Sequence, residues 1–87
     1  MYLSAWRRWR SLRRLPAAPT DIIAENLRRL RADRGWTQEE AADRAGLQQP
    51  SYARMELGRS PDVKLSTLLK LAQAFDVPLS DVLDGVD

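Results

Sequence analysis

Apolar residues recur at intervals of three and four along this chain, the spacing that places side chains on one side of an α-helix. The two clearest runs are Ile23, Leu27 and Leu30, and Leu68, Leu69, Ala72 and Phe75. No segment alternates between apolar and polar residues as a half-buried strand does. The pattern therefore predicts an all-α protein.

Capping and turn residues set the expected bounds of the first two helices. Thr20 or Asp21 can cap the first helix, and Gly35 suits the left-handed position that follows its end. Thr37 and Glu40 have the spacing of a capping box, in which each side chain bonds the other residue's backbone N–H. This box opens a short second helix.

Three more helices are expected downstream. The third is capped by Gln48, carries Pro50 in its first turn and ends at Gly58. The fourth follows the loop 59–64 with Ser66 as its cap, and Ser80 caps a last short helix. Five helices in residues 21–84 are therefore predicted to form one domain behind a basic leader, residues 1–20.

The second and third helices are expected to lie close together. The second is rich in alanine (Ala41, Ala42 and Ala45), so another backbone can approach it, and Gly46 permits a tight turn. A short helix turned across another is the helix-turn-helix arrangement, whose second helix enters the DNA major groove.

The exposed side of the third helix is predicted to carry Gln49, Ser51 and Arg54, with the small Ala53 between them. Glutamine can pair bidentately with adenine, and arginine with guanine. The sequence therefore predicts a DNA-reading face on this helix.

Many positions in residues 21–84 resemble the lambda-repressor-like, Cro-type helix-turn-helix domain of the XRE family. The matching positions are Thr37-Gln38-Glu39-Glu40, Ala42, Gly46-Leu47, Tyr52, Met55-Glu56, Gly58, Leu65-Ser66-Thr67-Leu68, Leu71-Ala72 and Val77 through Leu83. The resemblance implies a five-helix DNA-binding fold with a basic N-terminal arm.

The resemblance also implies roles for individual residues. Gln38 would touch a phosphate and brace Gln49, and Gln49 would read a base. Ser51 and Arg54 would face the groove. Arg59 and Ser60 would contact the DNA backbone. Gln48 has two interpretations, a helix cap or a base reader, and the cap is favoured.

Three departures from the family pattern stand out. Ala41 replaces a large aliphatic residue while Tyr52 replaces a branched one, which suggests an exchange of volume in the core. Pro50 stands where a polar residue commonly contacts a base, so one base contact is expected to be missing. Leu57 is expected to be an exposed apolar residue.

Composition narrows the function classes. The chain has 87 residues with no cysteine and no histidine, which excludes disulfides, Cys/His zinc sites and a serine–histidine relay. No glycine-rich phosphate loop is present, and no apolar run has the roughly 18 residues of a membrane span. We therefore expect no enzyme activity, cofactor or metal, no membrane partner, and a cytoplasmic, nucleoid-associated location.

The net charge of +2 is unevenly distributed. Residues 1–20 contain five arginines and no acidic residue, whereas the rest of the chain has nine basic and twelve acidic residues. The basic leader has four interpretations: a disordered extension, which is favoured, an arm that tracks DNA, a membrane-surface helix, or a helix that docks on a partner protein.

Other arginines have simpler expected roles. The arginines at 28, 29, 31 and 34 are expected to form a solvated helix face, with only Arg34 available to a phosphate. Arg54 has an alternative to base contact, a surface ion pair with Glu39 or Glu40.

These observations predict a sequence-specific transcriptional regulator of bacterial or phage origin. The favoured function is a homodimeric repressor that binds a palindromic operator in double-stranded DNA. The alternative is a DNA-binding antitoxin that represses its operon and also binds a toxin. A third class, an interaction module without DNA binding, remains open.

Overall fold

The computed structural model describes residues 18–86, and within that range it contains five helices and no strands. The helices are α2 (Pro19–Arg34), α3 (Gln38–Arg44), α4 (Gln49–Glu56), α5 (Leu65–Phe75) and α6 (Leu79–Val82). The predicted all-α class and the five expected helices are confirmed. The interpretations of the leader up to residue 17 lie outside the described residues.

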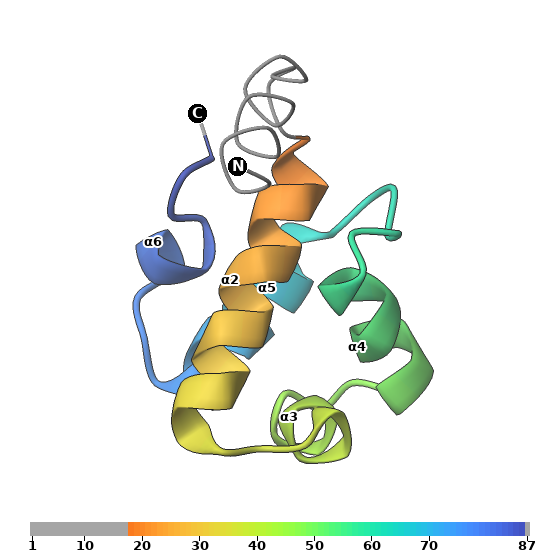
Figure 1. The fold of residues 1–87 in the computed structure, drawn as a ribbon, viewed down its shortest axis with the longest axis vertical. Coiled ribbons are helices and arrows are strands. Elements are labelled where there is room, and N and C mark those ends of the chain that lie inside the picture. Colours follow the sequence, from red (N-terminus) through yellow and green to blue (C-terminus); the bar gives the residue numbers. More distant parts are fainter. Residues whose placement is uncertain (1–17, 87) are drawn as a thin grey trace, which may run out of the picture.

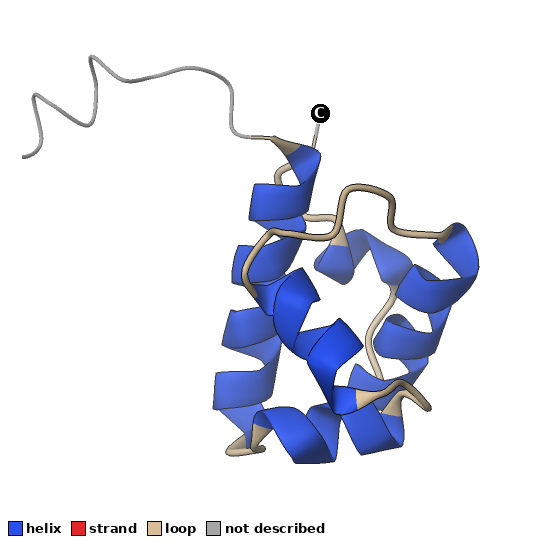
Figure 2. Ribbon diagram, turned by 90° about the vertical axis from the view of Figure 1, so that its right-hand side faces the viewer, coloured by secondary structure: helices blue, strands red, loops and turns tan. Residues whose placement is uncertain are grey.

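The helices are arranged around α2, which runs through the middle of the molecule (Figure 1). It packs against α4 on one side and α6 on the other, and α5 lies behind it and contacts α6. At one end of α2, α3 packs against α4. Figure 2 shows the molecule from the α4 side, with helices and loops alone in the described part. None of the helices in this part is long and apolar enough to cross a membrane.

The core is formed by the apolar stripes that the sequence predicted, except that Leu69 of the second stripe is 44% exposed and lies outside the core. Leu27, Leu71, Phe75 and Val82 are almost completely buried. Tyr52 is equally buried in the same cluster, which also contains Ala41. Both residues of the predicted exchange of volume therefore belong to the core.

The predicted start of α3 and the end of α2 are confirmed. The hydroxyl oxygen of Thr37 accepts a hydrogen bond from the backbone N–H of Glu40, and the Glu40 carboxylate accepts one from the N–H of Thr37, both at 3.1 Å. Gly35 follows α2 with φ 67°, in the left-handed region that favours glycine. Local side-chain chemistry thus fixes the connection between these two helices.

The predicted caps of α2 are wrong. The capping position belongs to Ala18, whose side chain makes no cap hydrogen bond, and Pro19 begins the helix. A residue before proline is restricted to extended backbone, which is the conformation of a capping residue, and proline suits the first turn. Thr20 and Asp21 therefore lie inside the first turn of α2.

The predicted caps of α5 and α6 are also wrong. The residue before α5 is Lys64 and the residue before α6 is Pro78, both in extended conformation without a side-chain cap bond. Ser66 and Ser80 lie one residue inside their helices. Both starts are exposed at Lys64 and Pro78. Water can therefore satisfy the first N–H groups of these helices, and no side-chain cap is needed.

The C-terminal end of the described chain is held to α2 by one buried amide. The side-chain nitrogen of Asn26 donates hydrogen bonds to the carbonyl oxygens of Val82 and Asp84, both at 2.8 Å. Asn26 is itself buried, so its amide replaces water as the partner of these carbonyls. This clamp fixes α6 against α2.

Candidate nucleic-acid interface

The interface is built on the turn between α3 and α4. Gly46 adopts φ 68°, and the N–H of Leu47 donates to the carbonyl of Ala42 at 2.9 Å, which closes the end of α3. Ala41, Ala42 and Ala45 are buried and small, so the two helices pack closely. This turn and packing form the predicted helix-turn-helix.

The two sides of α4 have different characters. Tyr52, Met55 and Glu56 are buried against the rest of the fold. The exposed positions of α4 and the residue after it are Gln49, Pro50, Arg54 and Leu57. The two residues predicted to read bases, Gln49 and Arg54, are therefore both available to a ligand outside the protein.

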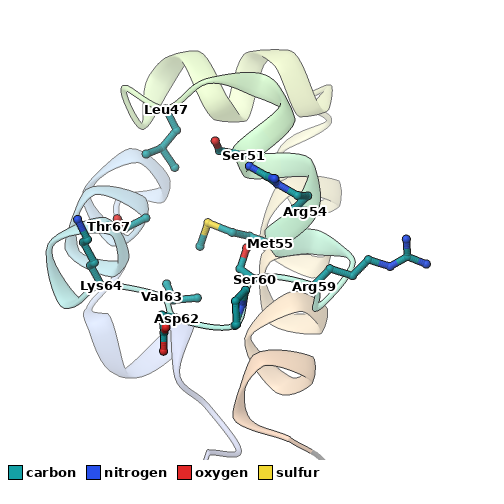
Figure 3. Close-up of a pocket in the computed structure, with 11 residues that line it drawn as sticks. Leu47, Ser51, Arg54, Met55, Arg59, Ser60, Asp62, Val63, Lys64 and Thr67 are labelled. Carbon is teal, nitrogen blue, oxygen red and sulfur yellow. The ribbon is translucent and has the colours of Figure 1, made fainter.

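A hollow of about 430 Å³ lies between α4, the loop after it and the start of α5. Four of the seven predicted DNA-binding residues line this hollow: Ser51, Arg54, Arg59 and Ser60. Figure 3 shows the sulfur of Met55 in its interior, whereas the guanidinium of Arg59 points away from it. The hollow thus joins the end of the recognition helix to the adjoining loop.

Lys64 and Thr67 also line this hollow, and sequence reasoning missed them. Both lie at the beginning of α5, next to a helix start that carries no side-chain cap. The sequence signal was Lys64 itself, a cation immediately before a predicted helix. The expectation that Ser66 would cap α5 placed that start two residues too late.

Gln38 has a different partner from the one expected. Its side-chain nitrogen donates to Oε1 of Glu56 at 3.0 Å, rather than bracing Gln49. Gln48 occupies the predicted capping position of α4, but its side chain makes no cap hydrogen bond and is exposed. Both glutamines therefore keep side-chain hydrogen-bonding groups that no residue in the described range uses.

Glu56 joins three helices from the buried side of α4. Arg31 binds its carboxylate with two hydrogen bonds, Nε to Oε2 at 2.6 Å and Nη2 to Oε1 at 2.9 Å. The guanidinium of Arg28 donates to the backbone carbonyl of Glu56, and Gln38 supplies the link from α3. The orientation of α4 relative to α2 and α3 is fixed by these contacts.

The protonation states follow from this arrangement. Burial alone would raise the pKa of the Glu56 carboxyl, but the bonds from Arg31 and Gln38 and the nearby Tyr52 hydroxyl outweigh it and lower the pKa. The bond to Glu56 raises the pKa of Arg31. Burial, together with the Glu56 carboxylate, raises the pKa of Tyr52. Glu56 is therefore ionised and Tyr52 neutral at physiological pH.

The predicted solvated arginine face is wrong for Arg31 and Arg34, which are half-buried, whereas Arg28 is exposed although it contacts α4. Arg28 and Arg31 bind Glu56. Arg34 donates to the carbonyls of Leu30 and Phe75, and its guanidinium lies 5.3 Å from the centroid of the Phe75 ring. Arg34 is therefore engaged within the fold, whereas Arg29 is exposed as expected.

The alternative role of Arg54 is wrong as well. Within residues 18–86 the ion pair is that of Arg31 with Glu56, and Arg54 pairs with neither Glu39 nor Glu40. The guanidinium of Arg54 is therefore not held by a carboxylate of the described chain.

The sequence is similar to several known regulators. A family model described as helix-turn-helix matches residues 27–82. The uncharacterized HTH-type transcriptional regulator YqaE of Bacillus subtilis is 38% identical over 65 residues, which cover 74% of this chain and 54% of the relative. The uncharacterized HTH-type transcriptional regulator y4dJ of Sinorhizobium fredii is 35% identical over 66 residues, covering 76% and 84%. The chain spans about half the length of YqaE and of the regulator DdrOP3 of Deinococcus deserti.

Solved structures show the same fold. The hypothetical transcription factor NHTF from Neisseria superposes with a TM-score of 0.73 at 32% identity, covering 80% of this chain and 82% of that one. The restriction-modification controller protein C.AhdI from Aeromonas hydrophila superposes with a TM-score of 0.71 at 32% identity, covering 76% and 98%. The chain therefore belongs to the helix-turn-helix family of transcriptional regulators, with a DNA-binding domain of the lambda-repressor-like, Cro type.

Proposed function

We propose that this regulator represses transcription by binding, as a homodimer, a two-fold symmetric operator in double-stranded DNA. The observation that carries the proposal is the outward side of α4, where Gln49 and Arg54 are exposed beside a hollow that Arg59, Ser60 and Lys64 border. Repression would follow from occupancy of an operator near a promoter, in the cytoplasm and on the nucleoid.

Two residues of α4 would read bases in the major groove. Gln49 lies in the first turn, the end that reaches base edges when a recognition helix docks. Its amide can form two hydrogen bonds with adenine, and the guanidinium of Arg54 can form two with guanine. These contacts would specify the sequence.

The residues around the hollow would bind phosphates. Arg59 extends away from the fold after α4, Ser60 follows it with a hydroxyl, and Lys64 supplies a second cation on the opposite side of the hollow. Gln38 gives one amide hydrogen to Glu56, which leaves its second hydrogen for a phosphate. Such contacts would set register and affinity without reading sequence. Gln48 would act as a further DNA contact, because its side chain is exposed.

A homodimer would place two copies of α4 in successive major grooves, about 34 Å apart. We propose contact through α6 and the loop 59–64. Leu65 and Leu69 lie one turn apart on α5 and are 61% and 44% exposed. Their apolar side chains would add to the area buried in the dimer interface.

The test is selection of bound fragments from random duplexes, and from the DNA upstream of the gene, at a stated salt concentration. We expect a palindromic site, and sedimentation should show a dimer at micromolar concentration with and without DNA. A monomer under both conditions would exclude the dimer. Absence of salt-dependent DNA binding would exclude the DNA-binding function and favour a protein-interaction module. The antitoxin alternative would be supported by a stable complex with a second protein that inhibits growth when it is produced without this one.

A further inference from the structure

The outward side of α4 carries an apolar stripe interrupted by one charged group. Pro50, Arg54 and Leu57 are all exposed and stand four and three residues apart, so they lie on one side of the helix. Leu57 is 60% exposed. Arg54 is the residue of this stripe whose side chain can form hydrogen bonds. The stripe is therefore unusual for a surface that binds a polar ligand.

Pro50 has no hydrogen to donate from either its side chain or its backbone nitrogen. It lies in the first turn of α4, directly after Gln49, and presents only methylene groups to the outside. The major groove offers one group that such a surface can recognise, the 5-methyl group of thymine.

We infer that Pro50 reads a thymine methyl group beside the base that Gln49 contacts. The inference rests on the proposed function, in which α4 enters the major groove. Gln49 and Pro50 are consecutive, so the two base pairs that they contact are neighbours or next neighbours. Each operator half-site therefore contains a thymine, on either strand, within two base pairs of the position that Gln49 specifies.

Leu57 provides the matched control, because it is exposed and apolar on the same stripe but lies at the other end of the helix. Seven residues separate it from Pro50, a rise of roughly 10 Å along the axis. At that distance we expect Leu57 to lie beyond the base edges that the first turn of α4 reaches.

The experiment uses the full chain and the half-site selected from random duplexes. Each thymine is replaced singly by deoxyuridine, which removes the methyl group and leaves every hydrogen-bonding atom in place. The position that Gln49 reads is located separately with Gln49→Ala. We expect one deoxyuridine near that position to weaken binding about fourfold, the factor for transferring a methylene-sized group out of water.

Two variants assign this effect to its residue. Pro50→Ser should remove the difference between thymine and deoxyuridine at that position while keeping the preference at the Gln49 position. Leu57→Ser should keep the difference unchanged. Thermal melts of both variants establish that they are folded.

The inference is overturned if deoxyuridine has no effect at any thymine in the wild-type complex, a result that needs no variant. It is also overturned if the half-site has no thymine within two base pairs of the Gln49 position, or if Pro50→Ser retains the difference. Failure of the proposed function gives a different result, since no preferred sequence would then be selected at all.

Discussion

At the scale of single residues, Gln49 and Arg59 separate base recognition from phosphate binding. Gln49→Ala should cost roughly 1–3 kcal/mol on the preferred site and relax the preference at one position per half-site. Arg59→Ala should weaken binding to all sequences alike and reduce the salt slope by about 0.9. Both side chains are exposed, so neither change should lower the melting temperature.

Competition titrations with specific and non-specific duplexes at several salt concentrations measure both quantities. If Gln49→Ala weakens binding to every sequence equally, α4 lies differently in the groove and Gln49 reads no base.

Glu56 makes the stability of the fold depend on acid pH. Its pKa in the folded protein is lower than the ordinary value of 4.5, because Arg31 and Gln38 stabilise the carboxylate against the effect of burial. The stabilisation from this group is therefore fully present above the ordinary pKa and is lost as the pH falls through the lowered one.

Glu56→Gln removes this titration while preserving the shape of the side chain. It should lower the free energy of unfolding by about 1.5–3 kcal/mol at pH 7, the range for a hydrogen bond to a charged group. Urea unfolding from pH 7 to pH 2.5 measures the difference between the variant and wild type. A difference that stays constant over this range would show that Glu56 does not titrate as described.

At the scale of elements, the start of α3 depends on its capping box, whereas the start of α5 depends on no side chain. Thr37→Ala should therefore lower the free energy of unfolding by about 1 kcal/mol. Ser66→Ala is the matched control, since Ser66 lies inside α5 and caps nothing, and it should change stability by less than about 0.5 kcal/mol. If chemical denaturation shows that both variants lose the same free energy of unfolding, Ser66 does act as a cap.

The sequence predicted every helix of the described chain, and its clearest markers were Gly35 at the end of α2 and the capping box at the start of α3. It failed at the starts of α2, α5 and α6, where polar residues suggested caps. Two of those starts need no side-chain bond, because Ala18 is held extended by the proline that follows it and the ring of Pro78 fixes its own φ.

The candidate site was predictable to the extent that it depends on one helix. The exposed positions of Gln49 and Arg54 follow from the spacing within α4 alone. The contacts of Glu56 do not, because Arg31 and Gln38 lie 25 and 18 residues away in the sequence. Within α4, Glu56 lies four residues after Tyr52 and therefore on the same buried side. A buried carboxylate needs a cation, so this spacing was the local signal that Glu56 has a cationic partner.

At the scale of the whole molecule, residues 1–17 of the leader differ in charge from residues 18–86. Residues 18–86 contain nine basic and eleven acidic side chains, a net charge of −2, whereas residues 1–17 contain five arginines and no acid. If the leader binds DNA, its removal should weaken binding and reduce the salt slope by about 0.9 for each phosphate that the leader neutralises.

Deletion of residues 1–17 keeps Ala18, which precedes α2, so the helix start is preserved. The matched control replaces the five arginines by glutamine at full length. We expect both proteins to melt like the wild type and to bind DNA more weakly. Unchanged affinity and salt slope in both would exclude the leader from DNA binding.

The buried amide of Asn26 has a consequence for how the folded molecule opens. A helix of four residues such as α6 cannot persist in water without tertiary contacts. Its attachment depends on the burial of Val82 and on the two carbonyls that Asn26 holds. Amide hydrogens after Pro78 should therefore exchange with solvent through a local opening that leaves the interior of α2 protected. A second copy bound at this end would slow that exchange, so assembly and local order would be thermodynamically linked.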